Sequence, residues 1–153
     1  MLAFSGKFIY TLDAKGRVSV PASFRSQLAK ESDNTFHVTF GPNECLFAYP
    51  REVFMHIAAR LEEKYGSLSS NDEERRFFLE TMASAQPCRC DQQGRIIIPQ
   101  EHLDYAKIDG EVLIIGAVNK FEFWNPERYD EFIKGSKFTK EERIRMFGGA
   151  DRG

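Results

Sequence analysis

The hydrophobic and polar positions of the chain form short apolar runs that are grouped in pairs. Within each pair a loop of a few residues separates two runs, a pattern that is typical of antiparallel strands joined in a hairpin. The runs are FHVTF (36–40) with CLFAY (45–49), and EVLIIGAV (111–118) with KFEFW (120–124). The pattern therefore predicts one β-hairpin in each half of the chain.

Helical spacing and capping residues predict helices around these hairpins. Apolar residues from Val53 to Tyr65 recur at helical intervals and predict a helix over 51–65. Shorter helical segments are expected in SFRSQLAK (23–30) and EHLDYAK (101–107). Capping residues predict three further helices: one that follows Asn71 and Glu74, one that follows Asn125 and Pro126 and ends near Gly135, and one that follows Thr139 and Glu142.

The chain carries one strand–turn–strand motif twice. TLDAKGRVSVPASF (11–24) and RCDQQGRIIIPQEH (89–102) share the pattern Asp-x-x-Gly-Arg, followed by a short strand-forming run and a proline. An aspartate side chain can accept hydrogen bonds from backbone N–H groups ahead of it, and glycine supplies positive φ, so each motif predicts a tight turn. The residues expected to shape the turns are Asp13 and Gly16 in the first copy and Asp91 and Gly94 in the second.

The two copies are expected to fold together. The hairpin segments 37–49 and 112–124 also align without a gap, so that Gly41 matches Gly116. A module of roughly 45 residues buries too little surface to be stable alone, so the sequence predicts a mainly β fold with flanking α-helices around one shared core. The expected organisation is a first module (7–54), a helical connector (55–84), a second module (85–128) and a C-terminal helical tail (129–153).

Charge is distributed unevenly along the chain. The net charge is −2 and the pI is near 6.0, whereas a nucleic-acid-binding domain more often has a basic pI. The N-terminal residues, however, are rich in cations, and acids cluster in the later helical segments. A basic N-terminal lobe is therefore expected, with its charge offset elsewhere.

Several kinds of site are not expected. No apolar window approaches the roughly 18 residues of a membrane span. The N-terminus lacks the pattern of a secretory signal, so an intracellular protein is expected. Cys45, Cys88 and Cys90 lack zinc spacing and are expected to be reduced thiols that hold no metal. The repeated polar set of Asp, Gly and Arg lacks a nucleophile, so neither an enzyme activity nor a cofactor is expected.

The motifs, in their order along the chain, resemble the MraZ family. The resemblance runs from Phe4 to Phe132 and rests on both Asp-x-x-Gly-Arg motifs, the Ser5-Gly6 pair, RRFF (75–78) and NKFEFW (119–124). It implies two swapped-hairpin β-barrel modules of the SpoVT–AbrB class. It further implies a bacterial, cytoplasmic and nucleoid-associated transcription regulator. Such a regulator binds short direct repeats in double-stranded DNA upstream of the division and cell-wall gene cluster, and it assembles as a ring of several protomers.

Five cations are the candidate DNA-binding residues. Arginine offers planar paired donors to phosphate or to the guanine edge, and Arg17 has Lys15 beside it in the first turn. The second turn has glutamines in place of the lysine, so the first copy is expected to be the better DNA face and the second mainly to complete the core. The candidates are Lys7, Lys15, Arg17, Arg25 and Arg95.

A protein-interaction module of the same fold class, resembling an antitoxin, is the alternative function. Antitoxins of this class commonly carry one module and a disordered toxin-binding tail, whereas this chain has two modules and a short tail. The resemblance favours a repressor over an activator. The ring size, the DNA repeat, the contact of the second module with DNA and the role of Cys88 and Cys90 stay open at this level.

Overall fold

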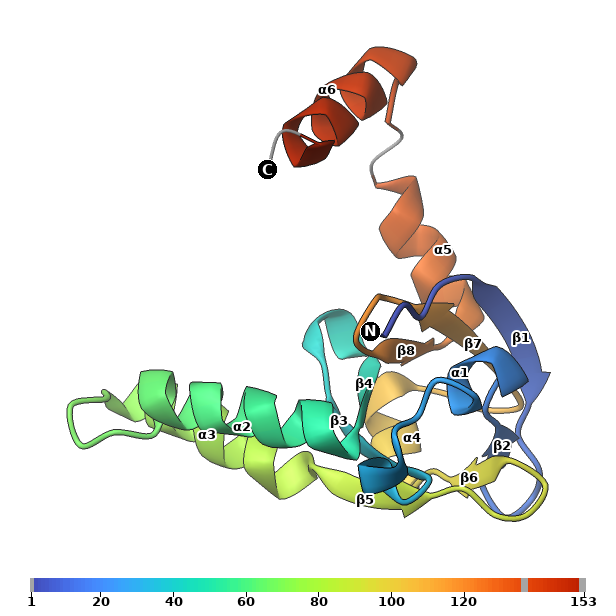
Figure 1. The fold of residues 1–153 in the computed structure, drawn as a ribbon, viewed down its shortest axis with the longest axis horizontal. Coiled ribbons are helices and arrows are strands. Elements are labelled where there is room, and N and C mark those ends of the chain that lie inside the picture. The colour runs from blue at the N-terminus through green and yellow to red at the C-terminus, as the bar shows by residue number, and fades with distance from the viewer. Residues whose placement is uncertain (1, 136–137, 152–153) are drawn as a thin grey trace.

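The computed structural model describes residues 2–135 and 138–151, in which the strands lie together and the helices flank them or project from them (Figure 1). The strands are β1 (Lys7–Thr11), β2 (Arg17–Ser19), β3 (Thr35–Phe40), β4 (Leu46–Pro50), β5 (Gln86–Arg89), β6 (Arg95–Ile97), β7 (Glu111–Gly116) and β8 (Phe121–Trp124). The helices are α1 (Ala22–Arg25), α2 (Arg51–Tyr65), α3 (Asp72–Ser84), α4 (Gln100–Ala106), α5 (Pro126–Lys134) and α6 (Lys140–Asp151), with 3₁₀ turns at Lys30–Ser32 and Pro42–Glu44.

The two halves of the chain interleave in antiparallel strand pairs. Six strands form one sheet in the order β1-β7-β8-β4-β3-β5, and β2 pairs with β6 in a separate two-stranded ribbon. β1 therefore pairs with β7 of the other half, and β5 pairs with β3. The expected mainly β fold with flanking helices is confirmed. Within the described residues β1 and β5 remain the edges of the six-stranded sheet, so this sheet does not close into a barrel.

Phenylalanines from both halves occupy the centre of the core. Phe24 of α1, Phe36 of β3 and Phe121 of β8 are at most 1% exposed. The ring centroids of Phe24 and Phe36 lie 5.1 and 4.9 Å from that of Phe121, in the tilted and edge-on arrangements that aromatic pairs favour. Val38 lies two positions after Phe36 in β3, and Phe123 lies two positions after Phe121 in β8. Each faces the core with its neighbour because side chains alternate across a strand.

The strand register corrects the alignment of the two hairpins by one residue. His37 is opposite Tyr49 in β3–β4, and Leu113 is opposite Trp124 in β7–β8. Because Tyr49 and Trp124 are counterparts, His37 is the counterpart of Leu113. The ungapped alignment, which matches Gly41 with Gly116, is therefore wrong for the residues before the loop. The loop between β3 and β4 is one residue longer than the loop between β7 and β8, and a strand shifted by one residue would exchange its core face with its outer face.

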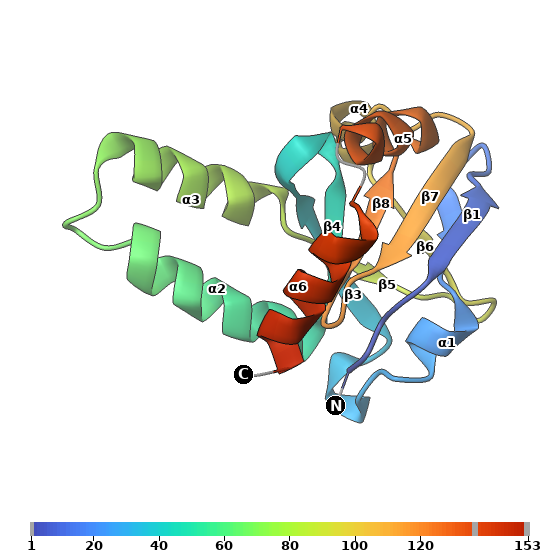
Figure 2. The same ribbon diagram turned by 90° about the horizontal axis from the view of Figure 1, so that it is seen from above.

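The helices α2 and α3 form a hairpin that projects from one side of the sheet (Figures 1 and 2). α2 spans the residues that apolar spacing predicted. α3 begins with a capping box, in which the Asn71 side chain accepts from the Glu74 N–H at 2.8 Å and the Glu74 carboxylate accepts from the Asn71 N–H at 3.1 Å. Both predicted helices are confirmed. Tyr65 and Phe77 join them, with ring centroids 5.3 Å apart.

The helix expected over 23–30 is wrong in its extent. α1 ends at Arg25, because the side chains of Ser26 and Gln27 both donate to the Ser23 carbonyl. Such local bonds compete with the helical pattern. The matching segment of the second copy is helical as predicted and forms α4.

Two helices follow the sheet at the C-terminal end. The Asn125 side chain accepts from the backbone N–H groups of Glu127 and Arg128 at 2.9 and 3.2 Å, which confirms the predicted start of α5. Thr139 and Glu142 exchange the predicted capping bonds before α6. No helix in the ranges 2–135 and 138–151 combines the length and apolar character that crossing a membrane requires.

Candidate nucleic-acid interface

The first Asp-x-x-Gly-Arg motif is a turn held by one carboxylate. Asp13 Oδ1 accepts from the backbone N–H groups of Lys15 and Arg17, each at 2.9 Å, and the Asp13 carbonyl accepts from the Gly16 N–H at 3.0 Å. Gly16 has φ +77°, which glycine adopts without the strain of a Cβ. The second oxygen, Asp13 Oδ2, accepts from Arg17 Nε at 2.6 Å. One side chain therefore shapes the turn and also orients the arginine.

The second motif repeats this geometry bond for bond. Asp91 Oδ1 accepts from the backbone N–H groups of Gln93 and Arg95 at 2.9 Å, and Asp91 Oδ2 pairs with Arg95 Nε at 3.0 Å. Gly94 also has φ +77°. The differing residues at the middle positions leave the turn unchanged, since the carboxylate bonds backbone groups there.

These hydrogen bonds favour the ionised form of both aspartates. The backbone N–H of Arg17 is the largest cause that lowers the pKa of Asp13 from 3.8 to about 2, and the side chain of Arg17 and the N–H of Lys15 add to it. The backbone N–H of Arg95 likewise lowers the pKa of Asp91. Both carboxylates are charged at neutral pH, and each is matched by the arginine four residues on.

The ribbon of β2 and β6 joins the two turns. Arg17 is opposite Ile97, and Ser19 is opposite Arg95. The bonds continue past the named strands, since Val20 N–H donates to the Gly94 carbonyl and Ile98 N–H donates to the Gly16 carbonyl, both at 2.9 Å. Figure 1 shows the ribbon on the side of the molecule away from the tip of the α2–α3 hairpin.

Alternation along the ribbon separates a core face from an outer face. Val18 and Ile96 are 1% exposed and belong to the core. Their neighbours point the other way, and Ile97 is 60% exposed. We call this side the ribbon face; it consists of Arg17, Ser19, Arg95 and Ile97.

The ribbon face brings together the arginines of both copies. Arg17 and Arg95 are diagonal neighbours, which stand roughly 7–8 Å apart in an antiparallel pair. Among the described residues, the bonds from each arginine to its aspartate use Nε, so the terminal Nη donors are left for another acceptor. The ion pair with aspartate therefore holds the Nε side of each guanidinium in place.

Arg25 lies against the second turn, although its position in the sequence suggested the first. Its Nε donates to the Val20 carbonyl at 3.1 Å. A Cβ placed on Gly94 would meet Arg25 Cζ at 2.5 Å, so the guanidinium rests directly on that glycine. At the first turn the corresponding neighbour of Gly16 is Leu103, with Cδ1 at 3.8 Å. The second turn therefore lacks a lysine of its own but receives a cation from the first copy.

The remaining two candidates differ in position. Lys15 is exposed at the tip of the first turn, beside Arg17. Lys7 begins β1 opposite Ile115, about 13 Å of strand before the turn, with Nζ 5.7 Å from the ring centre of Tyr129. The structure thus brings Lys15, Arg17, Arg25 and Arg95 to the two turns and the ribbon face, and it does not bring Lys7 there.

Sequence reasoning overlooked Ser19 and Ile97 as members of this surface. The signal was present, because a strand of period two places Ser19 with Arg17 and Ile97 with Arg95. Ile97 belongs to an unbroken run of three isoleucines, a pattern that predicts a fully buried strand.

The three cysteines are free and buried. Burial is the largest cause that raises the pKa of Cys45 to about 12 and the pKa values of Cys88 and Cys90 to about 11. These thiols are therefore protonated at neutral pH, a form that is a poor metal ligand and a poor nucleophile. No group of three or more potential metal ligands occurs in the part of the chain that the structure describes.

Known proteins are similar in sequence to this chain over most of its length. Residues 3–79 and 81–148 match the family described as "MraZ protein, putative antitoxin-like". The chain is 36% identical over 140 residues to a protein of Carboxydothermus hydrogenoformans, a match that covers 91% of this chain and 92% of the relative. A relative from Pediococcus pentosaceus is 40% identical over 132 residues, covering 86% and 87%. One from Halothermothrix orenii is 37% identical over 140 residues, covering 91% and 92%. Each of the three bears the name transcriptional regulator MraZ.

Proposed function

The chain belongs to the MraZ family, and from that premise we propose that it is a sequence-specific DNA-binding transcriptional regulator. The observation that carries the proposal is the ribbon face, on which Arg17 and Arg95 stand side by side with oriented guanidinium groups. The relatives are regulators by name and not members of an enzyme class, so no catalytic role is assigned to the turns.

The ribbon face has the chemistry for reading DNA. The major groove of B-DNA, about 12 Å wide, admits a two-stranded β-ribbon. Arg17 and Arg95 supply donors for phosphate or the guanine edge, Ser19 supplies a hydroxyl, and Ile97 can contact the methyl group of thymine. Lys15 and Arg25 stand at the two turns and add phosphate contacts.

The mild overall charge is compatible with this proposal because several copies can act together. Few phosphate contacts give weak, salt-sensitive binding by one protomer. A ring that presents the same face several times to short direct repeats gains a factor of about 10²–10⁴ from avidity. Acidic surfaces elsewhere on the chain keep the rest of the ring off the DNA.

The proposal takes its biological setting from the family resemblance. The regulated genes would be the division and cell-wall cluster, the effect repression, and the location the nucleoid in the cytoplasm. The strand exchange between the halves supports the swapped-hairpin arrangement of the SpoVT–AbrB class. The module boundaries 7–54 and 85–128 belong to the same proposal, with 55–84 as connector and 129–153 as tail.

Footprinting and one substitution test the proposal. The probe is the DNA directly upstream of the gene that encodes this chain, and the expected result is nuclease protection of closely spaced repeats. Arg17→Ala should raise the gel-shift midpoint at least tenfold, since a charge-assisted contact contributes about 1.5–3 kcal/mol. The control is Arg60→Ala, which removes an exposed arginine from α2. An unchanged midpoint for folded Arg17→Ala would refute the assignment of the face.

A protein-interaction role is the second candidate, because the family description includes the word antitoxin-like. In that role the chain would bind a partner protein and would leave its own upstream DNA unprotected. The footprint decides between the two candidates: protected repeats support the regulator, and an unprotected region together with a bound protein partner supports the interaction module.

A further inference from the structure

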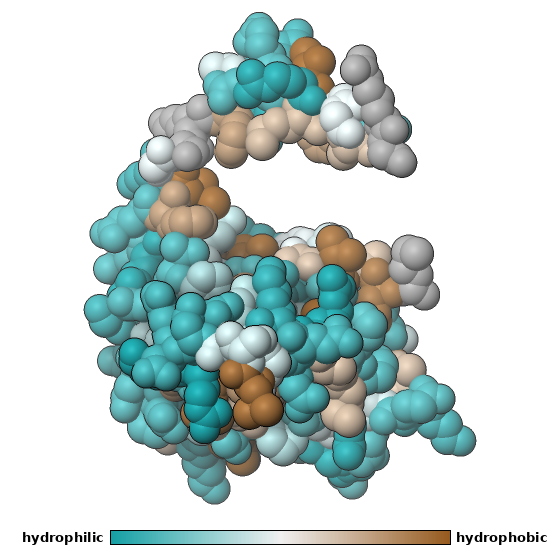
Figure 3. All heavy atoms as spheres, turned by 90° about the vertical axis from the view of Figure 1, so that its left-hand side faces the viewer, coloured by the Kyte–Doolittle hydropathy of each residue, from teal (hydrophilic) through white to brown (hydrophobic). Residues whose placement is uncertain are grey.

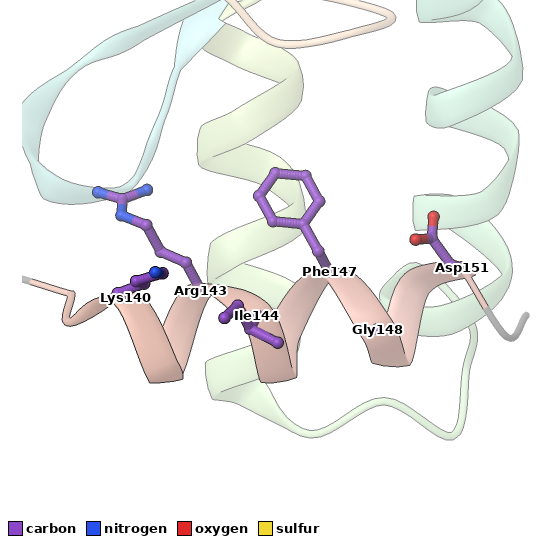
Figure 4. A pocket seen from close by; sticks show the side chains of 6 residues that line it. All are labelled: Lys140, Arg143, Ile144, Phe147, Gly148 and Asp151. Carbon is purple, nitrogen blue, oxygen red and sulfur yellow. The ribbon is translucent and has the colours of Figure 1, made fainter.

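Two of the hollows in the surface are bounded by apolar side chains, and they differ in how many elements surround them. The hollow along α6 has a volume of about 670 Å³, but the described residues that line it all belong to that one helix. Figure 3 shows open space between α6 and the body of the molecule, and Figure 4 shows the lining side chains on a single helix. A single wall cannot surround a ligand, so this hollow is a poor site for a small molecule.

A groove between the α2–α3 hairpin and the sheet is enclosed on several sides. Its volume is about 480 Å³, within the size range of small-molecule pockets. Its walls come from the helices α2, α3 and α4 and from the hairpin of β3 and β4. A concave site at a meeting of several elements can bury most of the surface of a small ligand.

Aromatic rings make up much of the lining of this groove. They belong to Phe40, Phe47, Tyr49, Phe54, Phe77 and Tyr105. Phe40 and Tyr105 stack with ring centroids 4.0 Å apart, whereas Phe77 is 51% exposed and is available for a further contact. The face of an aromatic ring attracts a cation, and Phe47 already holds the Lys120 ammonium 4.8 Å from its ring centre. The lining therefore suits apolar groups and positive charge together.

The carboxylate of Glu80 gives the groove a negative charge. Glu80 is the one charged residue among the described residues that line the groove, and within the described chain it forms no salt bridge. Burial is the largest cause that raises the pKa of Tyr105, and the charges of Glu80 and Glu44 add to it. Burial likewise raises the pKa of Tyr49, and the charge of Glu122 adds to it. Carboxylates therefore act on both tyrosines of the groove, and the potential there favours a cation.

We propose that the groove between the α2–α3 hairpin and the sheet binds a small organic cation that carries apolar groups. The apolar groups pack against the aromatic lining, the positive charge lies against the ring of Phe77, and Glu80 balances it. The Tyr105 hydroxyl is already used, since it donates to the Gly41 carbonyl at 2.6 Å, so Glu80 is the group that selects the charge of the ligand. No residue of the ribbon face lines the groove, and the site does not depend on the proposed function.

Tetraphenylphosphonium and tetraphenylborate test the proposal, because the two ions share a shape and differ in the sign of their charge. Isothermal titration calorimetry of the full chain, without DNA, measures the dissociation constant of each ion. The cation should bind about tenfold or more tightly than the anion, since the aromatic faces and Glu80 attract one and repel the other. Equal binding of the two ions, or no measurable binding of the cation, would overturn the proposal and leave the DNA-binding function untouched.

A charge substitution at Glu80 assigns the cation to the groove. Glu80→Gln removes the charge and keeps the size of the side chain, so tetraphenylphosphonium should bind about two- to fivefold more weakly, without loss of affinity for tetraphenylborate. Glu63→Gln is the matched control, because it removes an exposed carboxylate from the side of α2 that faces away from the groove. An equal loss in both variants would mean that the net charge of the chain attracts the cation, and this result would overturn the assignment.

A ring substitution separates the aromatic face from apolar area alone. Phe77→Leu keeps the wall apolar but removes the ring, so the affinity for tetraphenylphosphonium should fall about two- to fivefold. Phe147→Leu makes the same change on α6 and should leave the affinity unchanged; a loss in this variant alone would place the cation on α6 and overturn the proposal. Circular dichroism checks the folding of each variant, and Glu80→Gln, at an exposed position, decides the test if Phe77→Leu unfolds the hairpin. Unchanged affinity in a folded Phe77→Leu would refute the role of the ring.

Discussion

At the scale of single residues, Asp13 and Asp91 each use their two carboxylate oxygens for different contacts. One oxygen closes the turn through backbone N–H groups, and the other holds Nε of the arginine. An arginine held in this way needs little further ordering when it meets an acceptor. Under the proposed function the aspartates would act on DNA through the arginines, because a direct contact of a carboxylate with phosphate would be repulsive.

The sequence predicted the two turns because their chemistry is local. Asp, Gly and Arg at fixed spacing determine the turn wherever it lies in the fold. The position of Arg25 could not be predicted in this way. It depends on the pairing of β2 with β6, which brings the end of one copy's strand against the other copy's Gly94.

Substitution of Gly94 should disturb Arg25. Gly94→Ala and Gly110→Ala both place a Cβ at positive φ, near +80°, and each should cost about 1–2 kcal/mol of unfolding free energy. The new methyl group at position 94 also displaces the Arg25 guanidinium, whereas nothing lies within 4 Å at position 110. Denaturant unfolding with a gel shift checks this: Gly94→Ala should bind DNA more weakly than Gly110→Ala. Equal binding by both would show that the place of Arg25 is unimportant.

Acid should weaken the fold partly through Asp13. Its pKa is lowered in the folded chain, so its contribution to stability is complete above the ordinary value of 3.8 and is lost as the pH falls through about 2. Asp13→Asn keeps an oxygen for the backbone bonds but cannot titrate. Urea midpoints between pH 6 and pH 2 should therefore fall less steeply for this variant than for the unaltered chain. Parallel curves would contradict the assignment.

At the scale of elements, local signals predicted the helices apart from the extent of α1, and they did not reveal the register of the two hairpins. Asn71, Asn125 and Thr139 cap helices as expected, since capping depends on three or four neighbouring residues. The one-residue difference in length between the hairpin loops could not be predicted from the sequence, because aligning Gly41 with Gly116 produces an ungapped match of identical residues. Register depends on which face meets the core, and the β4–β8 contact that fixes it joins distant parts of the chain.

Adjacent isoleucines of β6 should respond in opposite ways. Ile96 is 1% exposed in the core, so Ile96→Ala should cost about 2–4 kcal/mol of unfolding free energy. Ile97 is 60% exposed on the ribbon face, so Ile97→Ala should change stability by less than about 0.5 kcal/mol while it weakens DNA binding. Thermal unfolding and a gel shift measure both effects. A large stability loss for Ile97→Ala would mean that the ribbon face is covered.

At the scale of the whole molecule, interleaving explains why two unequal copies form one surface. Neither half completes the sheet alone, because β1 and β5 each pair with a strand of the other half. The same exchange places one arginine from each copy on the ribbon face and carries Arg25 to the second turn. The sequence indicated a shared core and predicted DNA contact mainly for the first copy, a prediction that stays untested. A linear comparison could not show that the arginines of both copies meet on one ribbon.

The central claim is that both copies contribute an arginine to one DNA-binding face, and Arg95→Ala tests it most directly. The measurement is equilibrium binding of the folded variant to the upstream DNA, alongside Arg17→Ala and the double variant. We predict that Arg95→Ala weakens binding about tenfold or more, comparably to Arg17→Ala, and that the double variant binds more weakly than either. Binding by Arg95→Ala that equals the unaltered chain, with Arg17→Ala impaired, would contradict the claim and leave the second copy with an architectural role alone.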